Sequence, residues 1–278
     1  MTVVLALDKV TKRFGPVEVL HGVDLELHSG EVHALIGENG AGKSTIMKIL
    51  GGYLAATTGQ VLLDGAPIPY HTGPQGEAQV VVVIHQEFNL APDLTVAANI
   101  FLGREITKGA RLDHAAMRAA TAELLTRLDT TIRPDALIRE LSVPDRQMVE
   151  IAKALSRKAR VLIMDEPSAA LTHREVEALY AQVDRLRAEG VALMFCSHRL
   201  DEVSRLADRI TVLRDGSVVQ RALRGELSED GMATAMVGRE LTDIFPPKDT
   251  NSGETLLEVA NLNVQNVVKN VSLVLHKG

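Results

Sequence analysis

The chain has 278 residues, of which 46% are hydrophobic and 24% charged, the balance of a globular protein long enough to bury a core. Its formal net charge of −6 argues against a dominant nucleic-acid surface, which would need a basic balance. Cys196 is the only cysteine, so an intrachain disulfide is excluded. The longest apolar runs, such as Val191–Cys196, are far too short to span a bilayer.

The first 84 residues carry the apolar patterns of β-strands. Stretches in which apolar and polar residues alternate are typical of half-buried strands. Residues 79–84 are nearly all apolar and mostly β-branched, which indicates a buried strand of a parallel sheet. The predicted strands are Val3–Val10, Val17–Leu27, Glu31–Ile36, Gln60–Leu63 and Gln79–Ile84.

Residues 88–157 show helical spacing and indicate a helical insertion between two strands of a sheet. Helices are predicted at Leu94–Leu102, at Asp113–Leu128 with Asp113 as the N-cap, and at Asp145–Leu155. Short apolar strands return at 161–164, 191–196 and 210–213, with an amphipathic helix between the first two. Strands and helices alternate, so the predicted fold class is α/β.

The stretch Gly37–Thr45 fits the G-x-x-x-x-G-K-[ST] spacing of a phosphate-binding loop. Glycines let backbone N–H groups approach phosphate oxygens, and the following helix directs its positive end at the same anion. Lys43 would neutralise the β- and γ-phosphates, and the Ser44 hydroxyl would ligate Mg²⁺. The alternative is a glycine turn with an exposed lysine. The strand before the loop and the helix after it favour nucleotide binding.

Two carboxylates, Asp165 and Glu166, follow the predicted strand 161–164 directly. Open α/β sheets bind ligands at the carboxyl ends of their strands. Asp165 suits the Mg²⁺ shell of a phosphate-loop enzyme, and Glu166 suits the base that orients or deprotonates the attacking water. The alternative is that one carboxylate merely caps the helix after Pro167.

Gln86 and His198 also follow predicted strands. Alone, a histidine at a strand end is more often structural, and a single glutamine there means little. Their order along the chain is more informative: phosphate loop, glutamine, helical insertion, Asp-Glu, histidine. This order makes Gln86 a candidate for contact with the metal or water, and His198 a candidate for contact with the γ-phosphate.

From about Glu226 the sequence is expected to become a connector, with a linker at 241–255 that contains Pro246-Pro247. The tail repeats the start of the chain, which predicts the opening strands of a second, homologous domain at 256–278 that the chain does not complete. Chance similarity of two apolar patterns is the alternative. Leu257, Val259 and Leu262 repeat Leu5, Leu7 and Val10, and Leu273, Leu275, His276 and Gly278 repeat Leu25, Leu27, His28 and Gly30.

Five motifs together resemble those of an ATP-binding cassette domain, over residues 1 to about 240. Within that family, the sequence is most similar to the tandem-cassette ATPases of bacterial monosaccharide importers. The resemblance implies a P-loop NTPase fold with a mainly parallel core sheet, an N-terminal antiparallel β region and an inserted helical subdomain at about 88–157. The motifs are Gly37–Thr45, Ile84–Glu87, Leu141–Asp145, Met164–Pro167 and Ser197–Arg199.

The resemblance also assigns roles by position. Gln86 would be the Q-loop residue, Asp165 the Walker B aspartate, Glu166 the catalytic glutamate and His198 the switch histidine. Phe14 would stack on adenine, although a plain core or edge aromatic is the alternative. The implied cofactors are ATP and Mg²⁺; the implied nucleotide contacts are Phe14, Gly37, Asn39, Gly40, Gly42, Lys43, Ser44, Thr45, Ser142 and Asp165, with Ser44, Gln86 and Asp165 at the metal.

The signature motif departs from the family pattern. The usual Leu-Ser-Gly-Gly-Gln reads Leu-Ser-Val-Pro-Asp at residues 141–145. Pro144 has no N–H to offer a phosphate, and Asp145 brings a negative charge toward one. Ser142 remains, but the motif is expected to promote hydrolysis at an opposite cassette poorly.

The implied function is an ATPase subunit that energises monosaccharide import from the cytoplasmic face of the inner membrane. Its implied partners are membrane permease subunits, a second cassette normally in the same chain and, indirectly, a periplasmic sugar-binding protein, without nucleic acid. One alternative is a soluble tandem-cassette ATPase that acts on the ribosome or on nucleic acid. Another is a cassette fragment that only binds nucleotide.

Overall fold

The computed structural model describes residues 2–68, 80–85, 88–157, 159–169, 171–238, 253–265 and 267–277. The chain divides into two compact units, Met1–Arg239 and Glu240–Gly278. Across these described ranges, no helix is both long and apolar enough to cross a membrane.

A six-stranded sheet forms the centre of the first unit, in the order β12-β11-β3-β10-β9-β6. Adjacent strands of this sheet are parallel, except that β12 runs antiparallel to β11. All five residues of β3 and of β10 are buried, as in a sheet covered on both faces. The strands are β3 (Val32–Ile36), β6 (Val81–Ile84), β9 (Val161–Asp165), β10 (Ala192–Cys196), β11 (Arg209–Arg214) and β12 (Ser217–Leu223).

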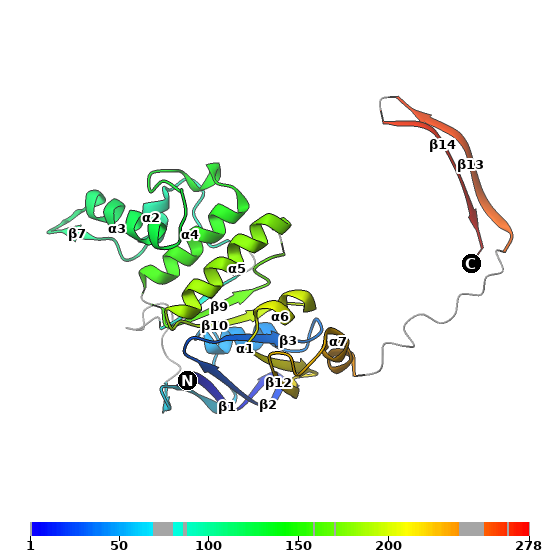
Figure 1. Ribbon diagram of the computed structural model, residues 1–278. Coiled ribbons are helices and arrows are strands. Elements are labelled where there is room, and N and C mark those ends of the chain that lie inside the picture. The colour runs from blue at the N-terminus through cyan, green and yellow to red at the C-terminus, as the bar shows by residue number, and fades with distance from the viewer. Residues whose placement is uncertain are drawn as a thin grey trace. The chain divides into compact units, whose positions relative to one another are not determined.

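A second, antiparallel sheet lies on one side of this core sheet, below it in Figure 1. Its apolar side chains pack with Ile46 and Ile49 of helix α1 (Lys43–Leu50) in one buried cluster. Strand alternation explains the arrangement, because every second residue of β2 from Val23 to Leu27 is buried. The strands, in sheet order, are β2 (Val17–His28), β1 (Val3–Phe14), β4 (Thr58–Leu63) and β5 (Ala66–Pro67).

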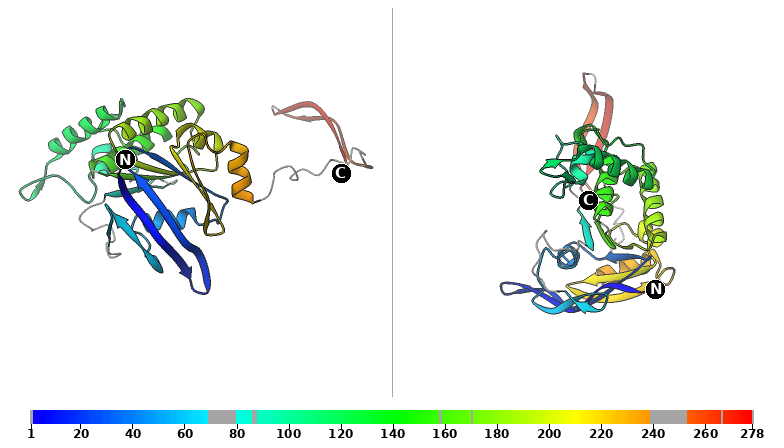
Figure 2. Two further views of the ribbon diagram at one scale, coloured as in Figure 1. Left: turned by 60° about the horizontal axis from the view of Figure 1, so that its bottom comes forward. Right: turned by 90° about the vertical axis from the view of Figure 1, so that its left-hand side faces the viewer.

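Helices cover the other side, above the core sheet in Figure 1 and separate from the antiparallel strands in Figure 2. The predicted insertion lies between β6 and β9, and Asp113 caps its second helix as predicted by accepting a hydrogen bond from the Ala116 N–H at 2.9 Å. The elements are α2 (Val96–Ile100), β7 (Thr107–Lys108), β8 (Arg111–Leu112), α3 (His114–Arg127), a 3₁₀ helix (Ile138–Glu140) and α4 (Val143–Ser156), followed after β9 by α5 (His173–Ala188).

The prediction of a connector from about Glu226 is wrong for residues 226–238. Helix α6 (Leu200–Leu206) precedes β11, and helix α7 (Glu229–Val237) follows β12. Ser228 caps α7 by accepting a hydrogen bond from the Gly231 N–H at 3.1 Å, and Met232 is fully buried in the core. Met232 is the only residue of α7 that is buried, so the sequence carries little helical periodicity there.

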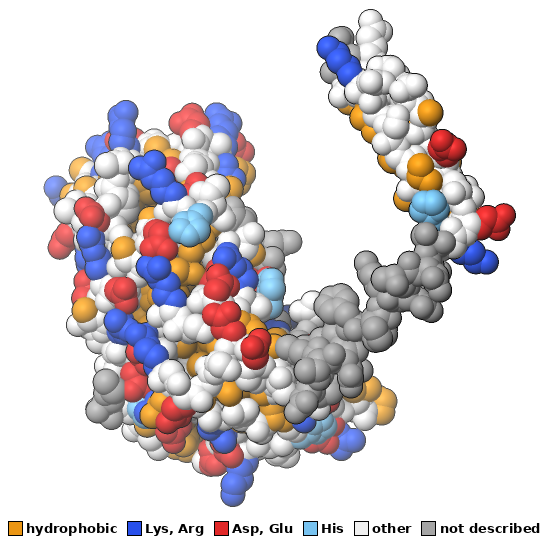
Figure 3. Space-filling model, turned by 45° about the vertical axis from the view of Figure 1, so that its right-hand side comes forward, with side chains coloured by type: hydrophobic (Ala, Val, Ile, Leu, Met, Phe, Trp, Pro, Cys, Tyr) orange, Lys and Arg blue, Asp and Glu red, His pale blue; other side chains and the backbone are white. Residues whose placement is uncertain are grey.

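The second unit contains a hairpin of β13 (Thr255–Val264) and β14 (Val268–His276), whose apolar side chains are visible along it in Figure 3. It reproduces the irregularity of the β1–β2 pairing. Asn261 has a left-handed φ of 50° and donates its N–H to Ser272, as Lys9 with a φ of 46° does to Asp24. The pairs Leu257–Leu275, Val259–Leu273 and Leu262–Val271 stand where the first hairpin has Leu5–Leu27, Leu7–Leu25 and Val10–Val23. The two hairpins thus share both their register and their bulge.

Candidate functional site

The glycine-rich loop joins the carboxyl end of β3 to the amino end of α1. Gly40 and Gly42 have φ angles of 86° and 109°, a region that residues with a Cβ rarely adopt. A Cβ on Gly42 would lie 2.7 Å from a methyl carbon of Leu20, and one on Gly37 would overlap the Leu213 carbonyl oxygen. The loop therefore requires glycine for its turn and for its close packing, as the phosphate-loop prediction demands.

Lys43 is the first residue of α1, and its ammonium group is held over this loop. It donates hydrogen bonds to the carbonyl oxygens of Gly37 at 2.7 Å and Glu38 at 3.0 Å. This places a positive charge beside the backbone N–H groups at the start of the helix. A polyphosphate bound here would lie close to the Lys43 ammonium, the N-terminus of α1 and the backbone N–H groups of the loop.

The residues present fit a magnesium nucleotide. Ser44 lies in the first turn of α1 and Asp165 ends β9, and both line the same cavity. Mg²⁺ is commonly held by one or two such oxygens plus phosphate oxygens rather than by a cage of protein ligands. Among the described residues, no group of three or more His, Cys, Asp or Glu side chains could hold a metal.

Asp165 lies in an environment that disfavours its negative charge. Burial raises the pKa of its carboxyl, and the neighbouring charge of Glu166 raises it further, while His85, Lys43 and Lys48 act in the opposite direction. A divalent cation beside Asp165 would relieve this penalty by stabilising the carboxylate. The metal role that the sequence predicts is thus consistent with the electrostatics of the site.

Glu166 is held in an unusual backbone conformation at the end of β9. Its φ is 45°, and its N–H donates to the Cys196 carbonyl oxygen of β10 at 2.9 Å. Its carboxylate oxygen lies 2.9 Å from Nδ1 of His198, which follows β10. Left-handed backbone at a non-glycine residue costs energy and recurs at functional sites. Two parallel strand ends thereby bring a candidate base and a candidate histidine into contact.

Lys43, Ser44, Asp165 and Glu166 line one cavity of about 440 Å³. Phe14, at the end of β1, lines it with 49% of its surface exposed, and the Lys12 ammonium lies 5.0 Å from the centre of its ring. The exposure of this ring excludes a core aromatic, while stacking on a base and a plain edge aromatic both fit it. The cavity is lined by Phe14, Val19, Asn39, Gly40, Gly42, Lys43, Ser44, Thr45, Asp165 and Glu166.

Gly37, Ser142 and His198 are not among the residues that line this cavity, although His198 contacts Glu166, which does line it. Gln86 lies outside the described residues. Ser142 is the N-cap of α4, where its hydroxyl donates to the Asp145 carboxylate at 2.7 Å. The helix begins at Val143, two residues before its predicted start, because Ser142 and Pro144 together are a strong N-terminal signal that the apolar pattern alone does not show.

Val19, which no sequence motif indicated, also lines the cavity from β2. A valine in an alternating strand carries no signal of a binding role, and only the pairing of β2 beside the loop reveals it.

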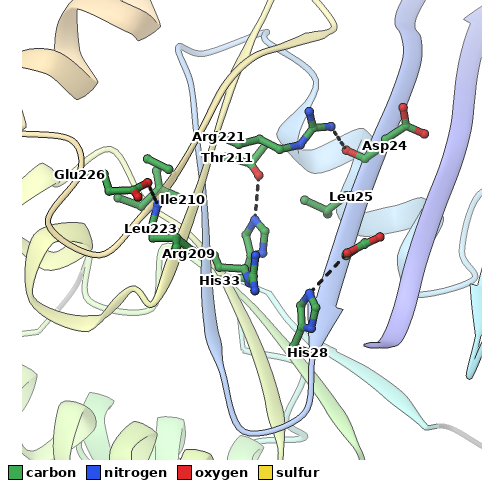
Figure 4. Close-up of a pocket in the computed structure, with 12 residues that line it drawn as sticks. Asp24, Leu25, His28, His33, Arg209, Ile210, Thr211, Arg221, Leu223 and Glu226 are labelled. Carbon is green, nitrogen blue, oxygen red and sulfur yellow. Dashed lines mark hydrogen bonds and ion pairs between the residues drawn. The ribbon is translucent and has the colours of Figure 1, made fainter. Parts of the chain in front are cut away.

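A second cavity, of about 500 Å³, lies between β2 and the β3–β11–β12 edge of the core sheet (Figure 4). Its walls carry the carboxylates of Asp24 and Glu26 beside the guanidinium groups of Arg209 and Arg221, and it has no glycine loop. Such mixed charge does not match a polyphosphate. His33 is buried in its wall, with Nε2 2.9 Å from the Thr211 hydroxyl.

His33 makes stability depend on pH. Burial, helped by the charge of Arg209, lowers its pKa from 6.5 to about 3. As the pH falls below 6.5, His33 therefore binds a proton in the unfolded chain but stays neutral in the folded chain. The free energy of unfolding is highest above that pH and falls progressively toward pH 3. Between pH 7 and pH 5 this lowers the free energy of unfolding by about 2 kcal/mol.

Urea unfolding at both pH values should show a smaller loss of unfolding free energy for His33→Gln than for the parent. The exposed-site control His21→Gln should match the parent, and equal losses in all three proteins would contradict the assignment.

The fold and the site together define a nucleotide-binding protein of the phosphate-loop class. A family model described as ABC transporter matches residues 20–169, more than half of the chain. The chain therefore belongs to the ABC transporter family, as the sequence motifs predicted.

Curated relatives are similar over the whole chain. It is 48% identical over 278 residues to the ribose import ATP-binding protein RbsA 1 of Rubrobacter xylanophilus, covering 100% of the chain and 56% of that protein. It is 46% identical to the ribose import ATP-binding protein RbsA 2 of Streptomyces avermitilis, covering 99% of the chain and 55% of the relative. The chain thus spans about half the length of the curated relatives it matches.

Solved structures share the fold. A nucleotide-free ATP-binding cassette from an ABC transporter aligns with a TM-score of 0.74 at 23% identity, over 85% of this chain and 96% of the other. A dimeric bacterial ABC transporter cassette aligns with a TM-score of 0.67 at 26% identity, over 79% and 98%. The predicted architecture, a mainly parallel core sheet with an antiparallel β region and an inserted helical subdomain, is confirmed.

Proposed function

We propose that the chain binds and hydrolyses MgATP and thereby energises the import of a monosaccharide through a membrane permease. The observation that carries the proposal is the cavity lined by residues of the glycine loop, Lys43, Asp165 and Glu166, with His198 in contact with Glu166. The two relatives named as ribose import ATP-binding proteins support a sugar as the cargo.

In this proposal each part of the site has a separate task. The loop from Gly37 to Thr45, including the backbone of Asn39 and Gly40, holds the phosphates, and Phe14 stacks on the adenine. Ser44, Asp165 and Gln86 hold Mg²⁺, which would neutralise charge on the transferred phosphoryl group. Glu166 orients the attacking water and accepts its proton, and His198, in contact with Glu166, meets the γ-phosphate.

The proposed organisation is a nucleotide-binding domain at residues 1–240, a linker at 241–255 and the first strands of a second cassette at 256–278. The repeated register and bulge of the β13–β14 hairpin support it. The length of the relatives supports it as well, because two such cassettes would fill them. Most of the linker lies outside the described residues.

The proposed signature, Leu141–Asp145, would face the phosphate loop of the second cassette. Its Ser142 hydroxyl donates to Asp145, and Pro144 carries no N–H. We infer that this composite site hydrolyses slowly, while the site at Lys43 depends on a signature from the second cassette.

The proposed partners are the permease, the second cassette and, indirectly, a periplasmic sugar-binding protein, at the cytoplasmic face of the cell membrane. Acidic and basic side chains are interspersed over the face shown in Figure 3, which supports a protein partner rather than nucleic acid.

Reconstitution of the full-length protein with its permease in proteoliposomes tests the proposal. We expect sugar-dependent phosphate release and sugar accumulation that both require MgATP, and much slower phosphate release from residues 1–278 alone. Accumulation without ATP, or ATP turnover that no permease and no sugar affects, would contradict a role in import. Fast turnover by residues 1–278 alone would contradict the dependence on the second cassette.

A further inference from the structure

Glu202 is a buried carboxylate for which the proposed catalytic steps have no use. It lies in the first turn of α6 with only 1% of its surface exposed. Burying a negative charge is costly unless the group is paired and hydrogen-bonded. It follows His198 by four residues, so its partners can lie in the loop that carries this histidine.

Both oxygens of Glu202 contact the loop that carries His198. Oε1 lies 2.9 Å from a guanidinium nitrogen of Arg199, and Oε2 accepts a hydrogen bond from the Ser197 hydroxyl at 3.3 Å. The Ser197 hydroxyl oxygen in turn accepts the Arg199 N–H at 3.0 Å. These contacts link the residue before His198 to the residue after it.

The histidine depends on this loop for its position. The His198 side chain is 62% exposed, so surrounding side chains do little to fix it, whereas Glu166 is only 22% exposed and anchored between two strands. The 2.9 Å contact between the two is therefore set mainly by where the loop holds the imidazole.

Glu202 influences two neighbouring side chains, Arg199 and Tyr180. The charge of Glu202 is the main cause that raises the pKa of Arg199, and it adds to burial in raising the pKa of Tyr180. The Asp201 carboxylate also contacts Arg199, at 3.0 Å, but the Asp201 side chain is 62% exposed. Within the described residues, Asp201 makes no hydrogen bond to Ser197. Asp201 is thus a matched acidic neighbour without the buried connection.

We propose that Glu202 is a positioning residue that holds His198 against Glu166 through Ser197 and Arg199. The inference rests on the proposed function for its catalytic consequence, but the positioning itself is a property of this chain.

Positioning can be measured directly. In the ¹⁵N-labelled chain, the ring nitrogen shifts of His198 report which nitrogen is protonated and hydrogen-bonded. Glu202→Gln keeps the volume but removes the charge that Arg199 contacts, so we expect the shifts to move toward those of a free imidazole. Asp201→Asn should leave them unchanged. Ser197→Ala, a smaller change, should move them in the same direction as Glu202→Gln. His198 shifts that neither Glu202→Gln nor Ser197→Ala alters would overturn the proposal.

The catalytic consequence is tested in the assembled transporter. Misplacement of a catalytic group by about 1 Å can cost about 10²-fold. We expect Glu202→Gln to lower kcat by about 10- to 100-fold with the KM for ATP unchanged. In a His198→Ala background it should have no further effect, because the group it positions is gone. An equal loss in both backgrounds would overturn the proposal and assign Glu202 a general structural role. If His198→Ala alone left kcat unchanged, the proposed role of His198 would fail, and the ring shifts would still decide the positioning.

Discussion

Glu166→Gln is expected to bind MgATP as the parent does and to lose about 10²- to 10⁴-fold in turnover, the usual worth of a positioned base. Glutamine has the same shape but cannot accept the proton of the attacking water. The left-handed backbone at Glu166 and its N–H bond to Cys196 do not depend on the carboxylate, so the fold should persist. Single-turnover phosphate release by the assembled protein, with nucleotide affinity measured separately, gives the two quantities.

The control is Glu177→Gln. Glu177 lies on α5, is 43% exposed and contacts Arg205, so its loss removes a carboxylate without approaching the nucleotide cavity. It should turn over at the parental rate. Parental turnover by Glu166→Gln would require another residue as the base.

Lys43→Ala is expected to weaken ATP binding by about ten- to a hundredfold. A hydrogen bond to a charged group contributes about 1.5–3 kcal/mol, which converts to that range. The Lys43 ammonium is already aimed at the loop by the Gly37 and Glu38 carbonyl oxygens, so little ordering is needed when it meets phosphate. Titration with a fluorescent ATP analogue measures the change.

Lys108→Ala serves as the control, since Lys108 is an exposed lysine of β7 that does not line the cavity and is not among the charges acting on Asp165. Its affinity should stay within about twofold of the parent, because exposed charge pairs contribute little. Equal affinities for the parent and Lys43→Ala would exclude Lys43 from phosphate binding.

The parts of the site predicted from sequence are those set by local spacing or by strand ends. The phosphate loop is one continuous stretch, so its glycines and lysine are recognisable without the fold. Asp165, Glu166 and His198 are separated along the chain, but parallel strands end at the same edge of a sheet, and β9 and β10 are recognisable from their continuous apolar runs. Their proximity in the fold follows from the adjacent positions of β9 and β10 in the sheet.

The parts that escaped prediction depend on packing between elements. Strand β12 buries only one of its seven residues, and α7 also buries a single residue, so neither carries a clear periodicity. Glu202 reads as an ordinary acidic residue in a helix, and only the packing of α6 buries it against Ser197 and Arg199.

The most direct test of the nucleotide site is a titration of the ¹⁵N-labelled chain with Mg²⁺ and a non-hydrolysable ATP analogue, followed through backbone amide shifts. We expect saturable shifts to gather at Gly37–Thr45 and at Asp165 and Glu166, and the amides around His33 in the second cavity to remain unchanged. Saturable shifts centred on His33, or none at the glycine loop, would contradict the proposed site.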